Sequence, residues 1–351
     1  MRTLVGLIVV LAAACTTQPV SPTVGPSASA SAAAAAPTLP VERFERGESQ
    51  GTGFLDVATG QFARDPNADM VTVNNQQSAL QRTQTQPYLY GAVGRYGGTA
   101  GFSGFVTYDA PLHRWVPVGR SHLTPDGLSY AYAEWFYPPV SQTPHPGTGP
   151  DPIGGRIHVT TVSSGLDRVV YSYTGWPGYE VVGLSSRYAY LAGECNGDYP
   201  GCNQLWQLDL ATSQLARVTE QTGQWWVIDR GVVWTEAVDF SRLIRIDLAG
   251  GGASTWLSRP FSDSMELIGV DASGSPWVSL GSPSPSPLLR VVAPERTQKI
   301  FAATGPYSSL VVDPRGTWFA VVDNQSPTPG LYLFTKDGGV KAVSDLPVLP
   351  V

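Results

Sequence analysis

Few residues of this 351-residue chain have the types and spacing that catalysis or metal binding requires. No two of its four histidines have the spacing of metal ligands. The chain contains no G-x-S-x-G nucleophile elbow, no H-E-x-x-H zinc motif and no phosphate-binding G-x-x-x-x-G-K-[ST] loop. We therefore expect no catalytic residue, no bound metal and no cofactor. The histidines are His113, His122, His145 and His158.

The first of three cysteines, Cys15, ends a run that is typical of an export signal. Arg2 precedes an apolar stretch that is too short to span a bilayer, where about 20 apolar residues are needed. The residues Ala12-Ala13-Ala14-Cys15 resemble the lipobox of bacterial lipoproteins, although that family usually has leucine where Ala12 stands. The resemblance implies cleavage after residue 14, a lipid on the Cys15 sulfur, and a mature protein held at an extracytoplasmic membrane surface. The alternative is an ordinary A-x-A cleavage site of a secreted protein.

The segment after Cys15 has the composition of a flexible spacer. Residues 16–40 are rich in Ser, Pro and Ala and contain no aromatic or charged side chain. Such a segment cannot bury enough apolar surface to offset the entropy lost on ordering. We expect a signal peptide over 1–14, the lipidated cysteine and a linker over 15–45, and one folded domain over 46–351.

The other two cysteines, Cys195 and Cys202, lie close together in a loop of turn residues. In an exported protein they should form a disulfide, worth about 2.5 kcal/mol in the loop-closure model. The bond would staple a hairpin connection or rigidify a recognition loop. Glu194, Asn196 and Asp198 leave a calcium site as an alternative, although their spacing does not match an EF-hand.

The composition indicates strands joined by tight turns. Charged residues make up 14% of the chain, against about 25% in typical soluble domains. The chain has 38 Gly, 30 Pro and ten Trp. Its net charge of −6, without a Lys/Arg cluster, gives no electrostatic footprint for nucleic acid.

Two kinds of segment recur in this all-β pattern. One alternates apolar and polar residues before a turn, as expected for a strand with one buried face. The other begins with an Asp- or Gly-containing turn and continues into a strand of small and aromatic residues. Examples of the first are 104–109, 157–162, 205–210, 243–248, 288–292 and 331–335. Examples of the second are 125–132, 186–191, 229–234, 271–278 and 313–320.

These segments recur with a period in the low-to-mid forties of residues, which is the repeat length that four-stranded propeller blades produce. The turns Thr124-Pro125-Asp126-Gly127 and Val312-Asp313-Pro314-Arg315-Gly316 resemble those of WD-repeat-like and TolB-like β-propellers, as do strands 205–210 and 243–248. The resemblance implies a β-propeller of four-stranded antiparallel blades. We favour six blades. Seven blades are the alternative, because residues 53–57 look like a further third strand or an edge strand. A sandwich or a two-domain all-β protein is another alternative to the propeller.

The leading functional hypothesis is a monomeric, non-enzymatic propeller, held at a membrane by the lipid on Cys15, that binds a protein or a small molecule through one face. An exported hydrolase or lactonase-like enzyme is the alternative, and it requires four dispersed residues to converge: His122, Glu134, Asp229 and Asp271. Carbohydrate recognition is a third hypothesis. Its candidate aromatics are Trp135, Trp225 and Trp226, which could otherwise fill the space between blades.

Overall fold

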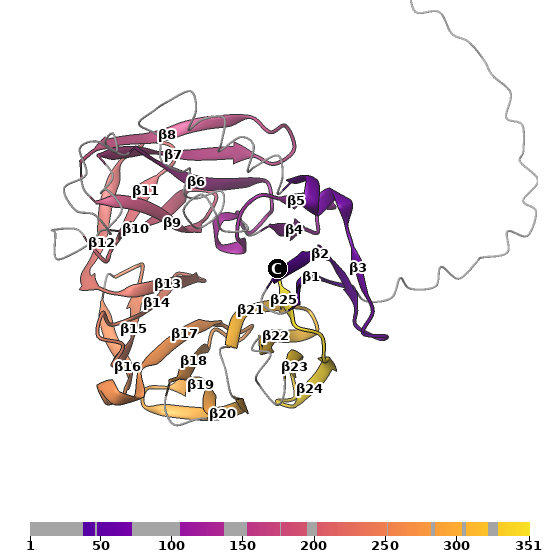
Figure 1. Cartoon of the computed structure of the whole chain (residues 1–351). Helices are drawn as coiled ribbons and strands as arrows, with labels where there is room; N and C mark the ends of the chain where they lie inside the picture. The colour runs from indigo at the N-terminus through magenta and orange to yellow at the C-terminus, as the bar shows by residue number, and fades with distance from the viewer. Residues whose placement is uncertain are drawn as a thin grey trace, which may run out of the picture. The chain divides into compact units, whose positions relative to one another are not determined.

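The computed structural model describes residues 38–45, 48–71, 106–136, 153–175, 177–194, 202–250, 252–281, 285–303, 307–321 and 329–351, and the structural statements below concern these residues. They belong to one compact unit that begins at residue 36. Strands dominate this unit, and every strand pairing in it is antiparallel. The confirmed fold is the all-β, propeller-type architecture that the repeat predicts (Figure 1).

Five sheets have four strands. One consists of β25 (Val348–Pro350), β1 (Thr38–Glu45), β2 (Glu48–Asp56) and β3 (Phe62–Arg64). The others are β9 (Gly178–Leu184), β10 (Tyr188–Glu194), β11 (Gln204–Asp209) and β12 (Leu215–Thr222); β13 (Gln224–Asp229), β14 (Val232–Glu236), β15 (Arg242–Asp247) and β16 (Ala253–Ser258); β17 (Met265–Val270), β18 (Pro276–Leu280), β19 (Ser286–Ala293) and β20 (Arg296–Ala303); and β21 (Tyr307–Asp313), β22 (Gly316–Val321), β23 (Gly330–Thr335) and β24 (Val340–Ser344).

Two sheets are smaller among the described residues. β6 (Ser129–Phe136), β7 (Gly154–Thr161) and β8 (Asp167–Thr174) form one, which a bridge between Leu123 and Tyr130 extends. β4 (Thr107–Asp109) and β5 (Arg114–Val116) form the other. Two 3-10 helices, η1 (Arg120–His122) and η3 (Phe261–Asp263), lie between strands. The described residues thus form seven sheets with unequal strand numbers, and the number of blades stays a prediction.

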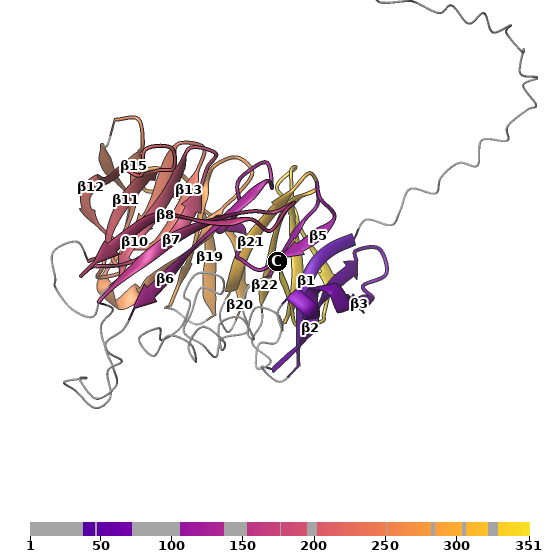
Figure 2. The ribbon, with the colours of Figure 1, turned by 90° about the horizontal axis from the view of Figure 1, so that it is seen from above.

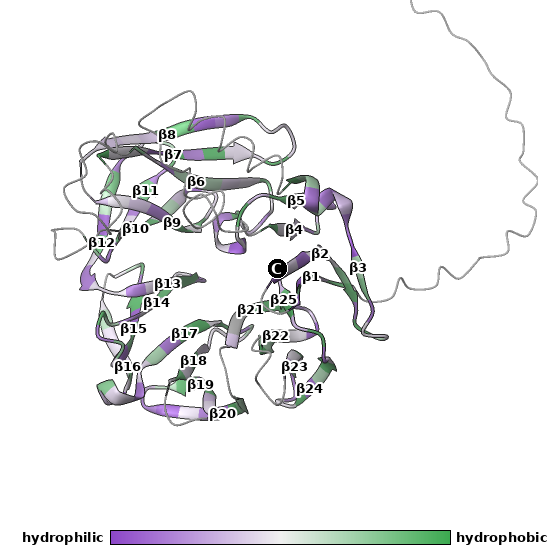
Figure 3. Ribbon diagram, in the orientation of Figure 1, coloured by the Kyte–Doolittle hydropathy of each residue, from purple (hydrophilic) through white to green (hydrophobic). Residues whose placement is uncertain are grey.

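Neighbouring sheets pack face to face, and the core lies between them. The first strands contact one another in succession from β9 through β13, β17 and β21 to β25. Hydrophobic residues lie along many strands (Figure 3), and successive side chains of one strand face opposite sides of its sheet. In β15, for example, Leu243 packs toward the sheet of β17 to β20, whereas Ile244 packs toward the sheet of β9 to β12.

The first sheet is closed by the opposite end of the chain. β25 pairs with β1 through Val348 opposite Arg43, Leu349 opposite Glu42 and Pro350 opposite Val41. The predicted linker over 15–45 therefore extends too far, because β1 already begins at Thr38. The alternation in Leu39-Pro40-Val41, where both aliphatic side chains are buried, gives this segment one strand face in the core.

The strands of neighbouring sheets run side by side, so their ends gather at two opposite ends of the unit (Figure 2). At the turn end, first strands turn into second strands. Arg230 in the β13–β14 turn donates to the carbonyls of Asp271 and Ala272 in the β17–β18 turn, and Arg315 in the β21–β22 turn donates to the carbonyl of Thr38. At the loop end, second strands lead to third strands and fourth strands lead into the next sheet.

Candidate functional site

Most acidic residues at the turn end are used to hold turns. Asp209 Oδ1 accepts the N–H groups of Ala211 and Thr212 at 2.9 and 3.0 Å, and these bonds lower the pKa of Asp209. Asp56 and Asp247 accept turn N–H groups in the same way. These carboxylates satisfy backbone donors and are not arranged for catalysis.

Asp126 and Asp109, which lie near His122 and His113 in the sequence, differ in their hydrogen bonding. Asp126 caps its own turn, as expected, because its Oδ1 accepts the Leu128 N–H and the Thr124 hydroxyl, and the pKa of Asp126 is lowered. Asp109 is buried, and neither of its carboxylate oxygens has a hydrogen bond of normal geometry within the described residues. Burial raises the pKa of Asp109.

The four residues that the hydrolase alternative requires do not converge. His122 Nδ1 lies 3.2 Å from the carbonyl of Ala131, and Asp229 accepts from Arg230 at 2.9 Å. Glu134 belongs to a further network around His158. Arg230 also donates to the Asp271 carbonyl, but the Asp271 carboxylate has its own partners, Arg290, Trp277 and Ser273. All four are among the described residues, and none of these hydrogen bonds joins two of their side chains directly.

The network around Asp271 stabilises a turn. Its carboxylate accepts from Arg290 Nε at 2.6 Å, from Trp277 Nε1 at 3.1 Å and from the Ser273 hydroxyl at 2.6 Å. Burial alone would raise the pKa of Asp271, but these hydrogen bonds outweigh it and lower that pKa. The ionised carboxylate therefore binds strand β19 to the β17–β18 turn.

A second network surrounds His158 on one face of the β6–β7–β8 sheet. His158 Nδ1 lies 2.8 Å from Asp167 Oδ2, and His158 Nε2 lies 3.3 Å from Glu134 Oε2. The Tyr132 ring stacks on the imidazole at 4.6 Å, and the Thr160 hydroxyl donates to Asp167 at 2.7 Å. Burial opposes protonation, but the two carboxylates outweigh it and raise the pKa of His158. The same bonds overcome burial of Asp167 and lower its pKa to about 2.

This network has the composition of an acid–base site without the geometry of one. Both ring nitrogens of His158 face carboxylates, so neither is left to activate a nucleophile. The Thr160 hydroxyl donates to Asp167 instead of to the imidazole. The sequence reasoning missed this cluster because Glu134 and His158 are 24 residues apart; only the β6–β7 register brings them together.

Two of the three candidate aromatics are core residues, which corrects their prediction as ligand-face side chains. Trp135 is buried, and its indole N–H donates to the carbonyl of Tyr179 at 2.6 Å. Trp226 is buried between the sheets of β9 to β12 and β13 to β16. Trp225 differs, because 66% of it is exposed.

The exposure of Trp225 has a backbone cause. The β13–β14 register shifts between Gln224 and Trp226, so Trp225 is an extra residue without a partner across the ladder. Its φ is +48°, a left-handed conformation that is strained for a bulky side chain. The bulge directs the indole into solvent while Trp226 fills the core.

Glu236 marks the loop end of β14. It is fully buried, its Oε1 accepts the Leu267 N–H of the next sheet, and its Oε2 has no hydrogen-bond partner among the described residues. Burial raises the pKa of Glu236 to about 8, so the side chain is mostly neutral at pH 7. Glu236 thus joins two sheets directly beneath the connection to β15.

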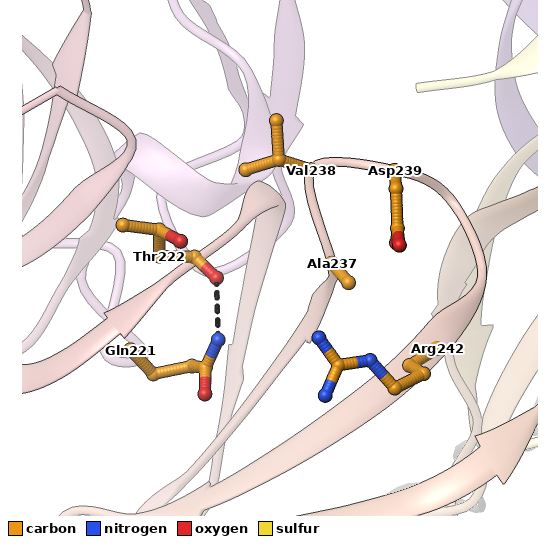
Figure 4. Close-up of a pocket in the computed structure, with 6 residues that line it drawn as sticks. All are labelled: Gln221, Thr222, Ala237, Val238, Asp239 and Arg242. Atoms are coloured by element: carbon orange, nitrogen blue, oxygen red, sulfur yellow. Dashed lines mark hydrogen bonds between the residues drawn. The ribbon is translucent and has the colours of Figure 1, made fainter. Parts of the chain in front are cut away.

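A pocket of about 310 Å³ lies at the loop end, where β12 and the β14–β15 connection meet (Figure 4). Ala237 is buried, and the guanidinium of Arg242 and the amide of Gln221 point toward one another beside it. The lining residues are Gln221, Thr222, Ala237, Val238, Asp239 and Arg242.

Two exposed aromatic side chains lie at the same loop end as this pocket. Trp225 follows Thr222 by three residues, and Phe261, at 75% exposure, lies in η3. The segment that carries Phe261 is bonded to the β14–β15 connection on both sides, through Arg259 N–H to Ser241 O and Met265 N–H to Phe240 O. We call the pocket together with Trp225 and Phe261 the rim.

The other predicted sites are only partly within the described residues. Cys15 and Cys195 lie outside them, so lipidation and the Cys195–Cys202 disulfide stay predictions; Cys202 itself is buried. The calcium alternative also lies outside, since Asn196 and Asp198 are not described. In the described part of the chain, no three His, Cys, Asp or Glu side chains are grouped as metal ligands. No helix found there is long and apolar enough to cross a membrane.

The chain matches no family model and no curated protein. It is similar to several solved propeller-containing structures. TolB from Acinetobacter baumannii aligns at 15% identity over 85% of this chain and 76% of its own, with a TM-score of 0.40. A putative TolB from Agrobacterium tumefaciens aligns at 11% identity over 63% and 78%, with a TM-score of 0.42.

An oligogalacturonate lyase in complex with manganese aligns at 15% identity, with a TM-score of 0.42. The alignment covers 63% of this chain and 63% of the lyase, which is less than two thirds of its length. At such identities these likenesses concern the fold alone. The assignment of a propeller-type fold rests on the chain's own sheet topology.

Proposed function

We propose that this protein is a membrane-anchored, extracytoplasmic propeller that binds a partner through the rim and does not catalyse a reaction. The observation that carries the proposal is the pair of exposed aromatics at the loop end: Trp225 follows Thr222 of the pocket by three residues, and Phe261 lies in a segment hydrogen-bonded to the β14–β15 connection. A large aromatic side chain stabilises a fold or a complex mainly through the burial of its apolar surface. Trp225 is 66% exposed in the free protein and has a strained φ, so most of its apolar surface can contribute to stability only when a partner covers it.

The arrangement of titratable groups supports binding over catalysis. The acids at the turn end are occupied by turn N–H groups or by arginines, and His158 is occupied by two carboxylates. The rim contains one carboxylate and one guanidinium, Asp239 and Arg242, and no histidine or cysteine. No observation favours the hydrolase alternative over binding.

Site-specific photo-cross-linking in intact cells tests this proposal. A benzophenone amino acid replaces Trp225 in the full chain, and a matched control replaces Leu166, which is 68% exposed in the β7–β8 turn at the other end. We expect a discrete cross-linked product from position 225 that weakens when Phe261→Ala is added, and none from position 166. Equal products at both positions, or none at position 225, would overturn the proposal.

A further inference from the structure

We propose that the rim is a carbohydrate site that takes an oligosaccharide, with one sugar residue in the pocket and a neighbouring one stacked on Trp225. This inference rests on the proposed function and names its ligand class. It follows from the chemistry of the pocket, its balance of charge and the distance to the indole.

The pocket offers both donors and acceptors that the fold leaves available. The Gln221 amide donates to the carbonyl of Thr222 at 3.0 Å, which leaves its Oε1 as an acceptor. Asp239 Oδ1 accepts from the N–H and hydroxyl of Ser241 at 3.1 and 2.6 Å, which leaves Oδ2. Arg242 is exposed, and its guanidinium forms no hydrogen bond or ion pair with any residue that the structure describes. A sugar hydroxyl both donates and accepts, so it can pair with each of these groups.

The charges of the pocket disfavour a small ion of either sign. Hydrogen bonds from Ser241 lower the pKa of Asp239, so its carboxylate is ionised and lies near the Arg242 cation. An anion would meet Asp239, and a cation would meet Arg242. An uncharged polyhydroxyl ligand avoids both repulsions and can form charge-assisted hydrogen bonds with both side chains.

Trp225 is close enough along the chain to extend the site. Three residues of extended chain span at most about 11 Å, so the backbone of Trp225 lies within that distance of Thr222 in the pocket. A ligand of at least two linked rings is long enough to cover such a span. The bulge holds the aromatic face in solvent, where the apolar face of a sugar ring can cover it.

A protein partner fits the rim less well. Docking sites for proteins usually have a contiguous apolar patch of a few hundred Å². Four of the six residues that line the pocket are polar or charged, and the exposed loop residue Val238 is followed by Asp239. Isolated aromatics among planar polar side chains are better suited to rings that carry hydroxyl groups.

The full chain is screened on an array of neutral oligosaccharides, and the bound oligosaccharide is titrated calorimetrically. We expect binding to oligosaccharides of two or more residues. Trp225→Ala and Arg242→Gln should each weaken it at least about tenfold, and the matched control Leu166→Ala should leave it unchanged. Trp225→Gly should also abolish binding while its unfolding midpoint stays equal to or above that of the wild type, because glycine relieves the positive φ. A merely structural tryptophan would lower that midpoint.

The outcomes separate this inference from the proposed function. Binding by the wild type that Trp225→Ala does not affect would overturn the carbohydrate site. An array on which no glycan binds would also overturn the carbohydrate site. If position 225 still cross-links a protein in cells, the proposed binding function stands and the ligand is a protein. Absence of both glycan binding and cross-linking would overturn both proposals.

Discussion

Closure of the first sheet by β25 should make Val348 one of the more sensitive positions of the chain. Val348 is fully buried in the cluster formed with Leu39, Leu55 and Leu331, although it lies three residues from the end of the sequence. Val348→Ala removes two methyl groups, worth about 0.8 kcal/mol each in lost burial, and leaves a cavity. We expect a loss of about 2 to 3 kcal/mol in the free energy of unfolding.

Urea unfolding followed by tryptophan fluorescence measures this loss. Val340→Ala is the control, because Val340 is also a strand valine but is 39% exposed in β24. It should cost less than about 1 kcal/mol, which reflects mainly strand preference. Deletion of residues 348–351 should cost more than Val348→Ala, since it also removes the Val351 N–H bond to Pro40 O and leaves the edge of β1 unpaired. If Val348→Ala costs no more than Val340→Ala, the closure is not a stabilising feature of the fold.

Four further predictions concern titratable groups in the fold and the anchor. The pKa of His158 is higher in the folded protein than its unfolded value of 6.5, so the protonated imidazole stabilises the fold below pH 6.5. The free energy of unfolding should fall as the pH rises through the folded pKa. The urea midpoint of His158→Gln should not show this pH-dependent fall. The lowered pKa of Asp167 has its effect at acidic pH. The free energy of unfolding should also fall as the pH drops from 3.8 to about 2. Glu236→Gln keeps an acceptor for the Leu267 N–H and removes a carboxyl whose pKa rises from 4.5 to about 8 on folding. The free energy of unfolding of this variant should exceed that of the wild type by about 4 kcal/mol at pH 8 and match it at pH 4. Equal free energies at pH 8 would contradict the burial argument. Cys15→Ala should abolish incorporation of labelled fatty acid and release the protein into the medium, and unchanged labelling would exclude lipidation of Cys15.

Local patterns predicted the strands and their turns well. The alternating segments 205–210 and 243–248 correspond to β11 and β15, each third in its sheet. The segment 53–57 lies in β2, which is likewise third in the order β25-β1-β2-β3. Asp and Gly at fixed places in a turn act within a few residues, so their effect can be deduced without the fold.

The site was predicted only in part, and the reason is visible at one dipeptide. Trp225 and Trp226 look equivalent in sequence, yet one is exposed and the other is core. A bulge in the β13–β14 ladder decides this, and a bulge depends on the register between two strands. The pocket also combines residues from two sheets, and no local pattern connects Gln221 with Arg242.

The sequence by itself determined the strand-and-turn repeat, the all-β class and the predicted export signal at Cys15, because these depend on side-chain types over short distances. Only the tertiary structure decided that β25 closes the sheet of β1, that His158 lies between Glu134 and Asp167, and that a bulge leaves Trp225 exposed. These features depend on contacts between residues far apart in the chain. Strand register and sheet packing create such contacts, and a linear pattern does not specify either of them.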